Sequence, residues 1–202
     1  GFGLFAIPLP LTVPQILAVD LGTDMVPALA LGAERPHRGI MDVPPRPRTE
    51  RLLSLSLLLR AYLFLGLIEA AIAMAGFFLY LFANGWTWGV ALSWSDPLYR
   101  QATTVTFAAI VIAQVANVFA CRSERVSIFR LGFFSNPFIL WGIAAELLLL
   151  LLIVYTPFGH WILGTSPLPL WVWPMLSLGA LGLLLAEELR KLISARFFSS
   201  AR

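Results

Sequence analysis

The stretch LAVDLGTDMVPALALG combines an apolar background with several oxygen-bearing side chains. Two carboxylates, Asp20 and Asp24, stand four residues apart, and Thr23 lies between them. In an ideal α-helix residues i and i+4 share one face, so both aspartates are expected to point together into the protein. Gly22 loosens the backbone between them, and Pro27 cannot donate a hydrogen bond to the Thr23 carbonyl. We therefore expect a broken helix with a freed carbonyl beside the acidic side chains.

These groups form an all-oxygen set, which suits hard cations such as Na⁺, K⁺ or Ca²⁺ and suits soft metals poorly. Asp20 and Asp24 are the expected metal ligands, with Thr23 as a third member of the cation site. A carboxylate at the centre of a bilayer costs about 2.5–3.5 kcal/mol on insertion scales. A cation or protons would offset that cost. The alternative is that both aspartates are protonated or hydrogen-bonded to neighbours and have only a structural role.

The composition is typical of a protein that crosses a membrane several times. Of the 202 residues 59% are hydrophobic and only 12% are charged, and the mean hydropathy is +0.83. A soluble domain rarely has such values. Cys121 is the single cysteine, which excludes an internal disulfide framework and a cysteine-based metal site.

A transmembrane helix needs roughly 20 mostly apolar residues, and five stretches meet this requirement. The expected spans are residues 11–33, 57–83, 102–121, 137–155 and 170–189. The expected fold class is an all-α polytopic membrane bundle of about five transmembrane helices, the first one broken. It forms a single domain over residues 1–202, with a proline-rich cytoplasmic loop at residues 34–56.

The charge distribution predicts how the bundle is oriented. Every lysine and arginine except Arg100 falls in one set of connections and ends, and positively charged loops stay in the cytoplasm. The N-terminus is therefore expected outside and the C-terminus in the cytoplasm. All tryptophans except Trp141 fall near the expected outer boundary, where indole rings are favoured. The basic loops of a membrane protein account for the net charge of +3. We therefore expect the lipid bilayer as a partner and no nucleic acid.

Four further polar residues fall inside the expected spans: Glu69, Gln114, Asn117 and Glu146. Each could be an ion ligand, a proton carrier or a hydrogen-bonding contact between helices. They are candidates for an additional ion or proton site. For Gln114 and Asn117, interhelical contact is an equally good interpretation.

The stretch PLPLTVPQILAVDLGTDMVPALALGAE, followed by IMDVPPRPRTERLL, resembles the sixth transmembrane helix and the next loop of type II P-type cation ATPases. This group contains the sodium/potassium and calcium pumps. LIEAAIAMAGFFLYLFANGW is similar to the seventh helix, VIAQVANVFACRSERVSIF to the eighth, NPFILWGIAAELLL to the ninth and AEELRKLISAR to the end of the tenth. The likeness extends over nearly the whole chain.

The resemblance implies that Asp20, Thr23 and Asp24 belong to the membrane cation sites of an ATP-driven pump. Asn117 and Ala145 stand where sodium pumps carry carboxylates associated with an extra sodium site. Glu146 keeps one carboxylate of that set. The resemblance therefore argues against a third sodium site. It also implies bacterial-like members of the group, hence a bacterial plasma membrane.

The chain has no D-K-T-G-T phosphorylation motif, no T-G-E motif and no nucleotide domain, so we expect no ATP hydrolysis by this chain alone. No cofactor is expected within it. ATP and Mg²⁺ would be used by other domains, and the remainder of the pump would be its partner. The alternatives are a stand-alone membrane partner or regulatory subunit, or a passive cation carrier derived from a pump.

Overall fold

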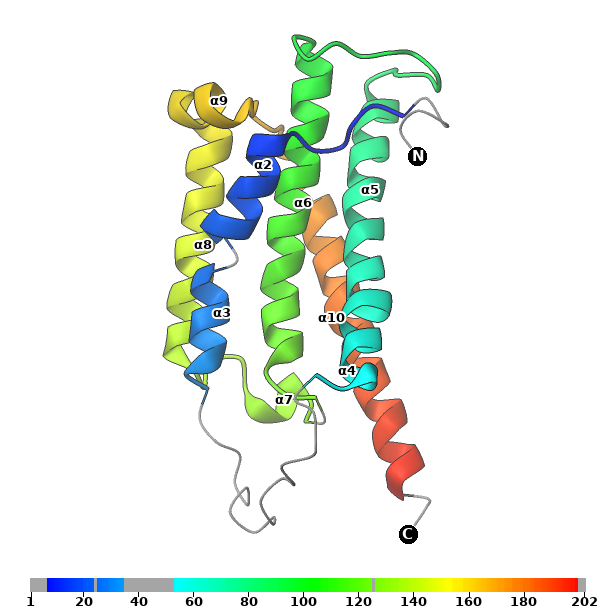
Figure 1. Cartoon of the computed structure of the whole chain (residues 1–202), viewed down its shortest axis with the longest axis vertical. Helices are drawn as coiled ribbons and strands as arrows, with labels where there is room; N and C mark the ends of the chain where they lie inside the picture. The colour runs from blue at the N-terminus through cyan, green and yellow to red at the C-terminus, as the bar shows by residue number, and fades with distance from the viewer. Residues whose placement is uncertain (1–6, 24, 35–52, 125, 200–202) are drawn as a thin grey trace.

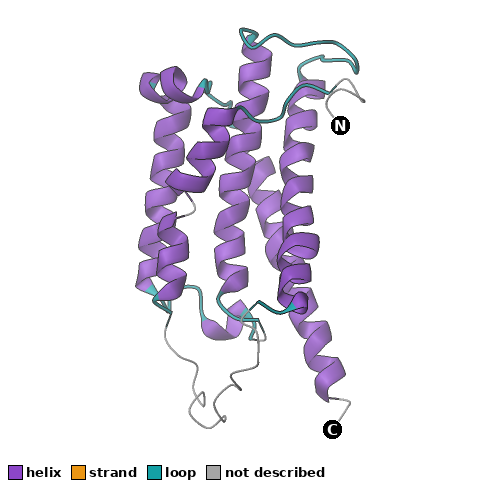
Figure 2. Cartoon of the chain, in the orientation of Figure 1, coloured by secondary structure: helices purple, strands orange, loops and turns teal. Residues whose placement is uncertain are grey.

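The computed structural model describes residues 7–23, 25–34, 53–124 and 126–199, and every regular element in these ranges is helical (Figure 2). Five helical segments are long and apolar enough to cross a membrane. They are Val13–Gly32, Leu55–Ala83, Pro97–Cys121, Pro137–Tyr155 and Val172–Arg196. The expected fold class, an all-α polytopic membrane bundle, is confirmed. Residues 35–52 of the expected proline-rich loop lie outside the described residues.

The first span is divided into α2 (Val13–Ala18), the π-helix η1 (Val19–Thr23) and α3 (Met25–Gly32). The expected break is therefore confirmed, and the irregular turn ends at Thr23, whose carbonyl cannot accept a helical hydrogen bond from Pro27. Pro27 lies in the first turn of α3, a position that tolerates a missing N–H.

A capping box fixes the start of α2. The Thr12 hydroxyl accepts a hydrogen bond from the Gln15 N–H at 3.4 Å, and Gln15 Oε1 accepts one from the Thr12 N–H at 3.1 Å. Two of the amide groups left over at a helix start are satisfied in this way. The same Gln15 side chain is fully buried and donates to the Thr103 hydroxyl at 3.5 Å.

The second span is also irregular, which the sequence did not predict. It comprises α4 (Leu55–Leu58), the π-helix η3 (Leu59–Leu65) and α5 (Gly66–Ala83). At the end of η3 the Gly66 N–H bonds to the Ala61 carbonyl, five residues back. No proline lies in this segment, so no simple sequence signal marks the wider turn.

The third span, α6 (Pro97–Cys121), is the central helix of the bundle. Asp96 caps its first turn, which starts five residues before the expected Ala102. Figure 1 shows the first span and α8 (Pro137–Tyr155) on one side of α6, and α5 and α10 (Val172–Ser199) on the other. An ion site with ligands from both sides of the bundle would therefore include α6.

A glycine allows α5 to approach its two neighbours closely. A Cβ atom on Gly76 would lie 3.4 Å from Val105 on α6 and 3.4 Å from Leu176 on α10. Small residues have this effect in membranes, where helices associate through close packing instead of through a hydrophobic driving force.

The two ends of the bundle differ in their chemistry. At the end that carries α9 (Pro157–Leu163), the rings of Tyr80 and Trp171 stack with centroids 5.7 Å apart. Arg100 at this end donates to the carbonyls of Gly164 and Thr165 at 3.3 and 3.2 Å. The opposite end carries α7 (Ile128–Leu131) and most of the described arginines.

At the α7 end, charged side chains from three parts of the chain form two neighbouring groups of ion pairs, here together called the α10 charge cluster. Its members are Arg60, Glu124, Glu187, Glu188, Arg190 and Lys191. The Glu187 carboxylate is fully buried and binds Arg60 at 2.6 Å and Arg190 at 2.8 Å. Glu188 binds Lys191 at 2.9 Å and accepts from the Ile128 N–H at 3.3 Å. The cluster joins η3, the α6–α7 connection and α10.

Removing the buried carboxylate should destabilise the α7 end of the bundle. We expect Glu187→Ala to lower the free energy of unfolding by about 3 kcal/mol, because two partly buried arginines lose their fully buried partner. Thermal or denaturant unfolding in detergent micelles would measure the effect. As a control, Glu124→Ala should cost less than about 1 kcal/mol, since that side chain is 64% exposed and 3.9 Å from Arg60. Equal losses in the two variants would contradict this account.

Candidate cation site

The break in the first span places Thr23 inside the bundle. Its side chain is fully buried, and its hydroxyl donates to the Val19 carbonyl at 3.0 Å. A second acceptor, Gln114 Oε1 on α6, lies 3.4 Å from the same hydroxyl. The hydroxyl thus connects the irregular turn with the central helix, 91 residues away in sequence.

Glu146 lies on the face of α8 that meets the break. One turn before it, a Cβ on Gly142 would lie 3.3 Å from the Pro27 Cα, and one turn after it Leu149 lies beside Gly22. Residues spaced three and four apart share a helix face, so Glu146 is positioned between these two contacts. Its side chain is only 2% exposed. A buried carboxylate at this level is a strong candidate for an ion or proton role.

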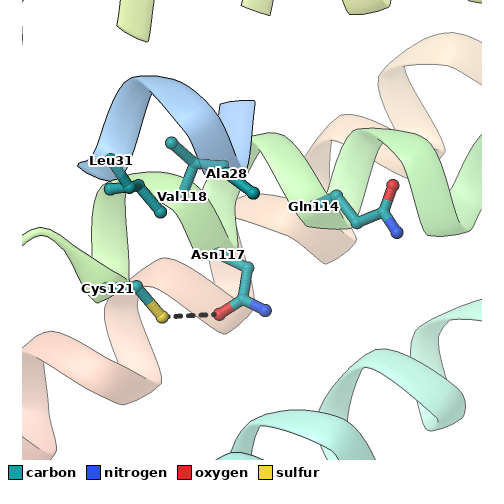
Figure 3. A pocket seen from close by; sticks show the side chains of 6 residues that line it. All are labelled: Ala28, Leu31, Gln114, Asn117, Val118 and Cys121. Carbon is teal, nitrogen blue, oxygen red and sulfur yellow. Dashed lines mark hydrogen bonds between the residues drawn. The ribbon is translucent and has the colours of Figure 1, made fainter. Parts of the chain in front are cut away.

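A cavity of about 240 Å³ opens between α3 and α6. Ala28 and Leu31 line it from α3. From α6 it is lined by Gln114, Asn117, Val118 and Cys121 (Figure 3). Asn117 Oδ1 accepts a hydrogen bond from the Cys121 thiol at 3.5 Å. The two amides give this otherwise apolar space polar walls, and Gln114 links it to Thr23.

The remaining predicted residues are not brought together in the same way. Asp20 is exposed on the surface of the chain, so the expectation that it points into this bundle is wrong. That expectation assumed α-helical spacing, whereas residues 19–23 form a π-helix with a wider turn. Glu69 is half-buried on α5, which packs against α6 and α10 and not against the broken span.

Asp24 lies outside the described residues. Among the described residues, no three His, Cys, Asp or Glu side chains come close enough together to hold a metal ion. The structure therefore brings Thr23 and Gln114 together, with Glu146 on the face of α8 that meets the same break and Asn117 in the adjoining cavity. Amide and hydroxyl oxygens supplement a carboxylate in this set, a composition that suits a hard cation.

Sequence reasoning missed several polar contacts that hold this region. The Gln15–Thr103 hydrogen bond was not predicted, although a glutamine inside an apolar span is a signal for a buried contact. Arg122 was interpreted only as a mark of topology. Its side chain is in fact buried and paired with Glu34 at 2.7 Å.

Comparison with known proteins assigns the chain to a family. The sequence model of the family described as "Cation transporting ATPase, C-terminus" matches residues 8–193. The chain belongs to this family. The family assignment confirms the resemblance found in the sequence, which rested on the D-L-G-T-D-M-V-P core and on the four later helices.

Members of the family that are similar to this chain include sodium/potassium-transporting ATPase subunits. The alpha-2 subunit of Gallus gallus is 33% identical over 95% of the chain, and the alpha-4 subunit of Rattus norvegicus is 34% identical over 96%. The alpha-2 subunit of Homo sapiens is 32% identical over 95%. In each case the chain spans 21% of the relative's length.

The Thr23–Gln114 contact should be measurable as an energetic coupling. We expect Thr23→Val and Gln114→Leu each to cost about 1 kcal/mol of unfolding free energy, because each leaves a buried partner without its bond. The double variant should cost about 0.6 kcal/mol less than the sum, the usual coupling for such bonds in membranes. Unfolding in detergent micelles would give all three values.

A control pair lies at the α9 end of the bundle, away from the mid-span contact. Tyr80 donates to Gln101 Oε1 at 3.0 Å and shares no partner with Thr23. Tyr80→Phe combined with Thr23→Val should therefore be additive. Additivity of Thr23→Val with Gln114→Leu would argue against the contact.

Proposed function

We propose that this chain is the C-terminal membrane part of an ATP-driven cation pump and supplies oxygen ligands for the transported ion. The family and the relatives support this assignment. Because the chain spans about a fifth of those relatives, the remainder of the pump would carry the ATP and Mg²⁺ chemistry. In this proposal Asp20, Thr23 and Asp24 bind the cation.

One observation supports the site most strongly: an irregular turn at mid-span, with a fully buried hydroxyl at its end. Broken helices recur in transporters because backbone released from regular hydrogen bonding can face an ion. Thr23 lies at the break, Gln114 is within 3.4 Å of its hydroxyl, and Glu146 is buried at the same level. The oxygen chemistry favours Na⁺, K⁺ or Ca²⁺. Gln114, Asn117 and Glu146 would extend the site, whereas Glu69 is less well placed.

The exposure of Asp20 supports a large protein partner. A carboxylate in the middle of a span costs about 2.5–3.5 kcal/mol when it faces hydrocarbon. None of the described helices covers it. We infer that earlier helices of the same pump pack against this face and bring further ligands to Asp20.

We infer that the α7 end faces the cytoplasm and that the first span enters from outside. Arginines collect at the α7 end, as the positive-inside rule expects of a cytoplasmic end. The stacked rings of Tyr80 and Trp171 at the α9 end suit a membrane–water interface. The expected location is a bacterial plasma membrane. Accessibility of tags placed in the α7 and α9 connections would test the orientation.

The transport step would be a change between two states, and both phosphorylation and ion binding would bias it. Phosphorylation in another domain and ion binding at the break would each favour one arrangement of α2 and α3. The π-helical turn is a suitable joint for this movement, since irregular turns inside helices often mark functional hinges.

Two alternative functions predict different experimental outcomes. A stand-alone regulatory subunit would co-purify with a pump that lacks its own late helices. A passive carrier would conduct cations after reconstitution without ATP. The coding sequence directly upstream separates these from a pump, which requires a further helix preceded by a phosphorylation motif.

The decisive variant is Asp24→Asn in the full-length pump. It should abolish or sharply weaken ion-dependent phosphorylation, because the cation loses a charged ligand. Phosphorylation measured against the concentrations of Na⁺, K⁺ and Ca²⁺ would show the loss and identify the ion. Glu124→Gln removes an equal charge from an exposed position outside the proposed site and should leave the dependence unchanged. Unchanged ion affinity in Asp24→Asn would count against the site.

A further inference from the structure

We propose that Glu34, Arg122 and Asn136 form an anchor that holds α3 against α6 and α8 and thereby positions the cation site. This group is called the Glu34 anchor below. The inference rests on the proposed function, because the site that it positions is the proposed cation site. The anchor is separate from the α10 charge cluster, with which it shares no residue.

Three donors converge on the Glu34 carboxylate. Arg122 Nη2 lies 2.7 Å from Oε1, and Arg122 Nε lies 3.0 Å from Oε2. Asn136 Nδ2 donates to Oε2 at 2.9 Å. A bidentate arginine–carboxylate pair fixes the relative orientation of its partners as well as their separation. Glu34 follows α3 by two residues, so the pair holds the end of that helix.

The Arg122 side chain is buried and fixed by further hydrogen bonds. It is 1% exposed, and beyond Glu34 it donates to the Gly132 carbonyl at 2.8 Å and to the Ser135 hydroxyl at 2.7 Å. Gly132 has a positive φ of 82°, a conformation that side chains other than glycine rarely adopt. The loop between α7 and α8 is therefore shaped to receive the guanidinium.

The anchor joins the ends of three helices. Glu34 follows α3, Arg122 is the first residue after α6, and Asn136 caps α8 by accepting from the Phe138 N–H at 3.0 Å. Figure 1 shows these three helix ends side by side near α7. A change in the position of α3 relative to either neighbour would therefore stretch the same set of bonds.

The position of α3 determines the shape of the cavity. Ala28 and Leu31 form its α3 wall, and Gln114 and Asn117 belong to its α6 wall. At its other end α3 is connected to α2 only through the irregular turn. With the Glu34 anchor intact, α3 moves together with α6 and α8, and the bending is confined to η1. Without it, α3 separates from α6, and Thr23 loses its register with Gln114.

The test is made in the full-length pump with Arg122→Met and Arg122→Lys. Arg122→Met should raise the cation concentration for half-maximal phosphorylation about five- to tenfold, within the range by which positioning residues change coupling. Maximal phosphorylation at saturating cation should remain. Arg122→Lys keeps the charge but loses the bidentate geometry, so its shift should be smaller and in the same direction. The double variant Glu34→Gln/Arg122→Met should shift no further than Arg122→Met, because both changes break one contact.

A structural readout follows α3 directly. Val118 lines the cavity and is only 8% exposed, so maleimide alkylation of a thiol placed there by Val118→Cys, in a Cys121→Ser background, reports how far α3 lies from α6. Arg122→Met should accelerate this alkylation severalfold, as measured by mass spectrometry of the peptide that carries the thiol. Arg190→Met is the matched control, since it removes an inner-end arginine that binds Glu187 on its own helix and does not touch α3. It should change neither the alkylation rate nor the cation dependence.

The outcomes separate the anchor from the proposed function. Unchanged cation dependence and unchanged alkylation of the Val118→Cys thiol in a folded Arg122→Met protein would overturn the anchor. If that variant does not fold, the same two readouts in Arg122→Lys decide. If the unaltered pump shows no cation-dependent phosphorylation, the proposed function fails. The positioning role fails with it, whatever the alkylation rate.

Discussion

The fold depends on one constraint: a helix that crosses hydrocarbon must satisfy its backbone polar groups within the protein. The first span departs from regular α-helical bonding at Val19–Thr23 and compensates locally. The Thr23 hydroxyl donates to the Val19 carbonyl and also lies within reach of Gln114 on the central helix. A single polar side chain thus makes the irregular turn tolerable and links it to the rest of the bundle. The same departure is what makes backbone and side-chain oxygens accessible for an ion.

The central helix α6 contacts the first span at three levels. Gln15 meets Thr103 near one end, Thr23 meets Gln114 in the middle, and Glu34 meets Arg122 near the other end. Their sequence separations of 88, 91 and 88 residues belong to two helices that run in the same direction and nearly in register. The contacts to α6 before and after the irregular turn therefore fix the span on both sides of it. A movement at the turn then stays local and is not spread over the whole span.

Much of this could be predicted from the sequence, because hydropathy and charge directly determine which segments lie in the bilayer. The five spans, the break near Gly22 and Pro27, and the basic end followed from residue types alone. The type of break did not follow, since a π-helix depends on what Thr23 finds on a neighbouring helix. The exposure of Asp20 and the pairing of Arg122 with Glu34 were also missed. Both depend on which helix faces which, and periodicity within one span carries no information about that.

The pairing of cationic side chains at the α7 end has an electrostatic consequence. Arg60, Arg122, Arg190 and Lys191 would create a field that repels positively charged ions if each stood alone. In the structure each lies within 2.9 Å of a carboxylate, with Glu187 shared by Arg60 and Arg190, and Glu124 adds a fourth negative charge 3.9 Å from Arg60. By sequence this rim is strongly basic, yet in the folded chain these four residues present little barrier to a metal ion approaching from that side.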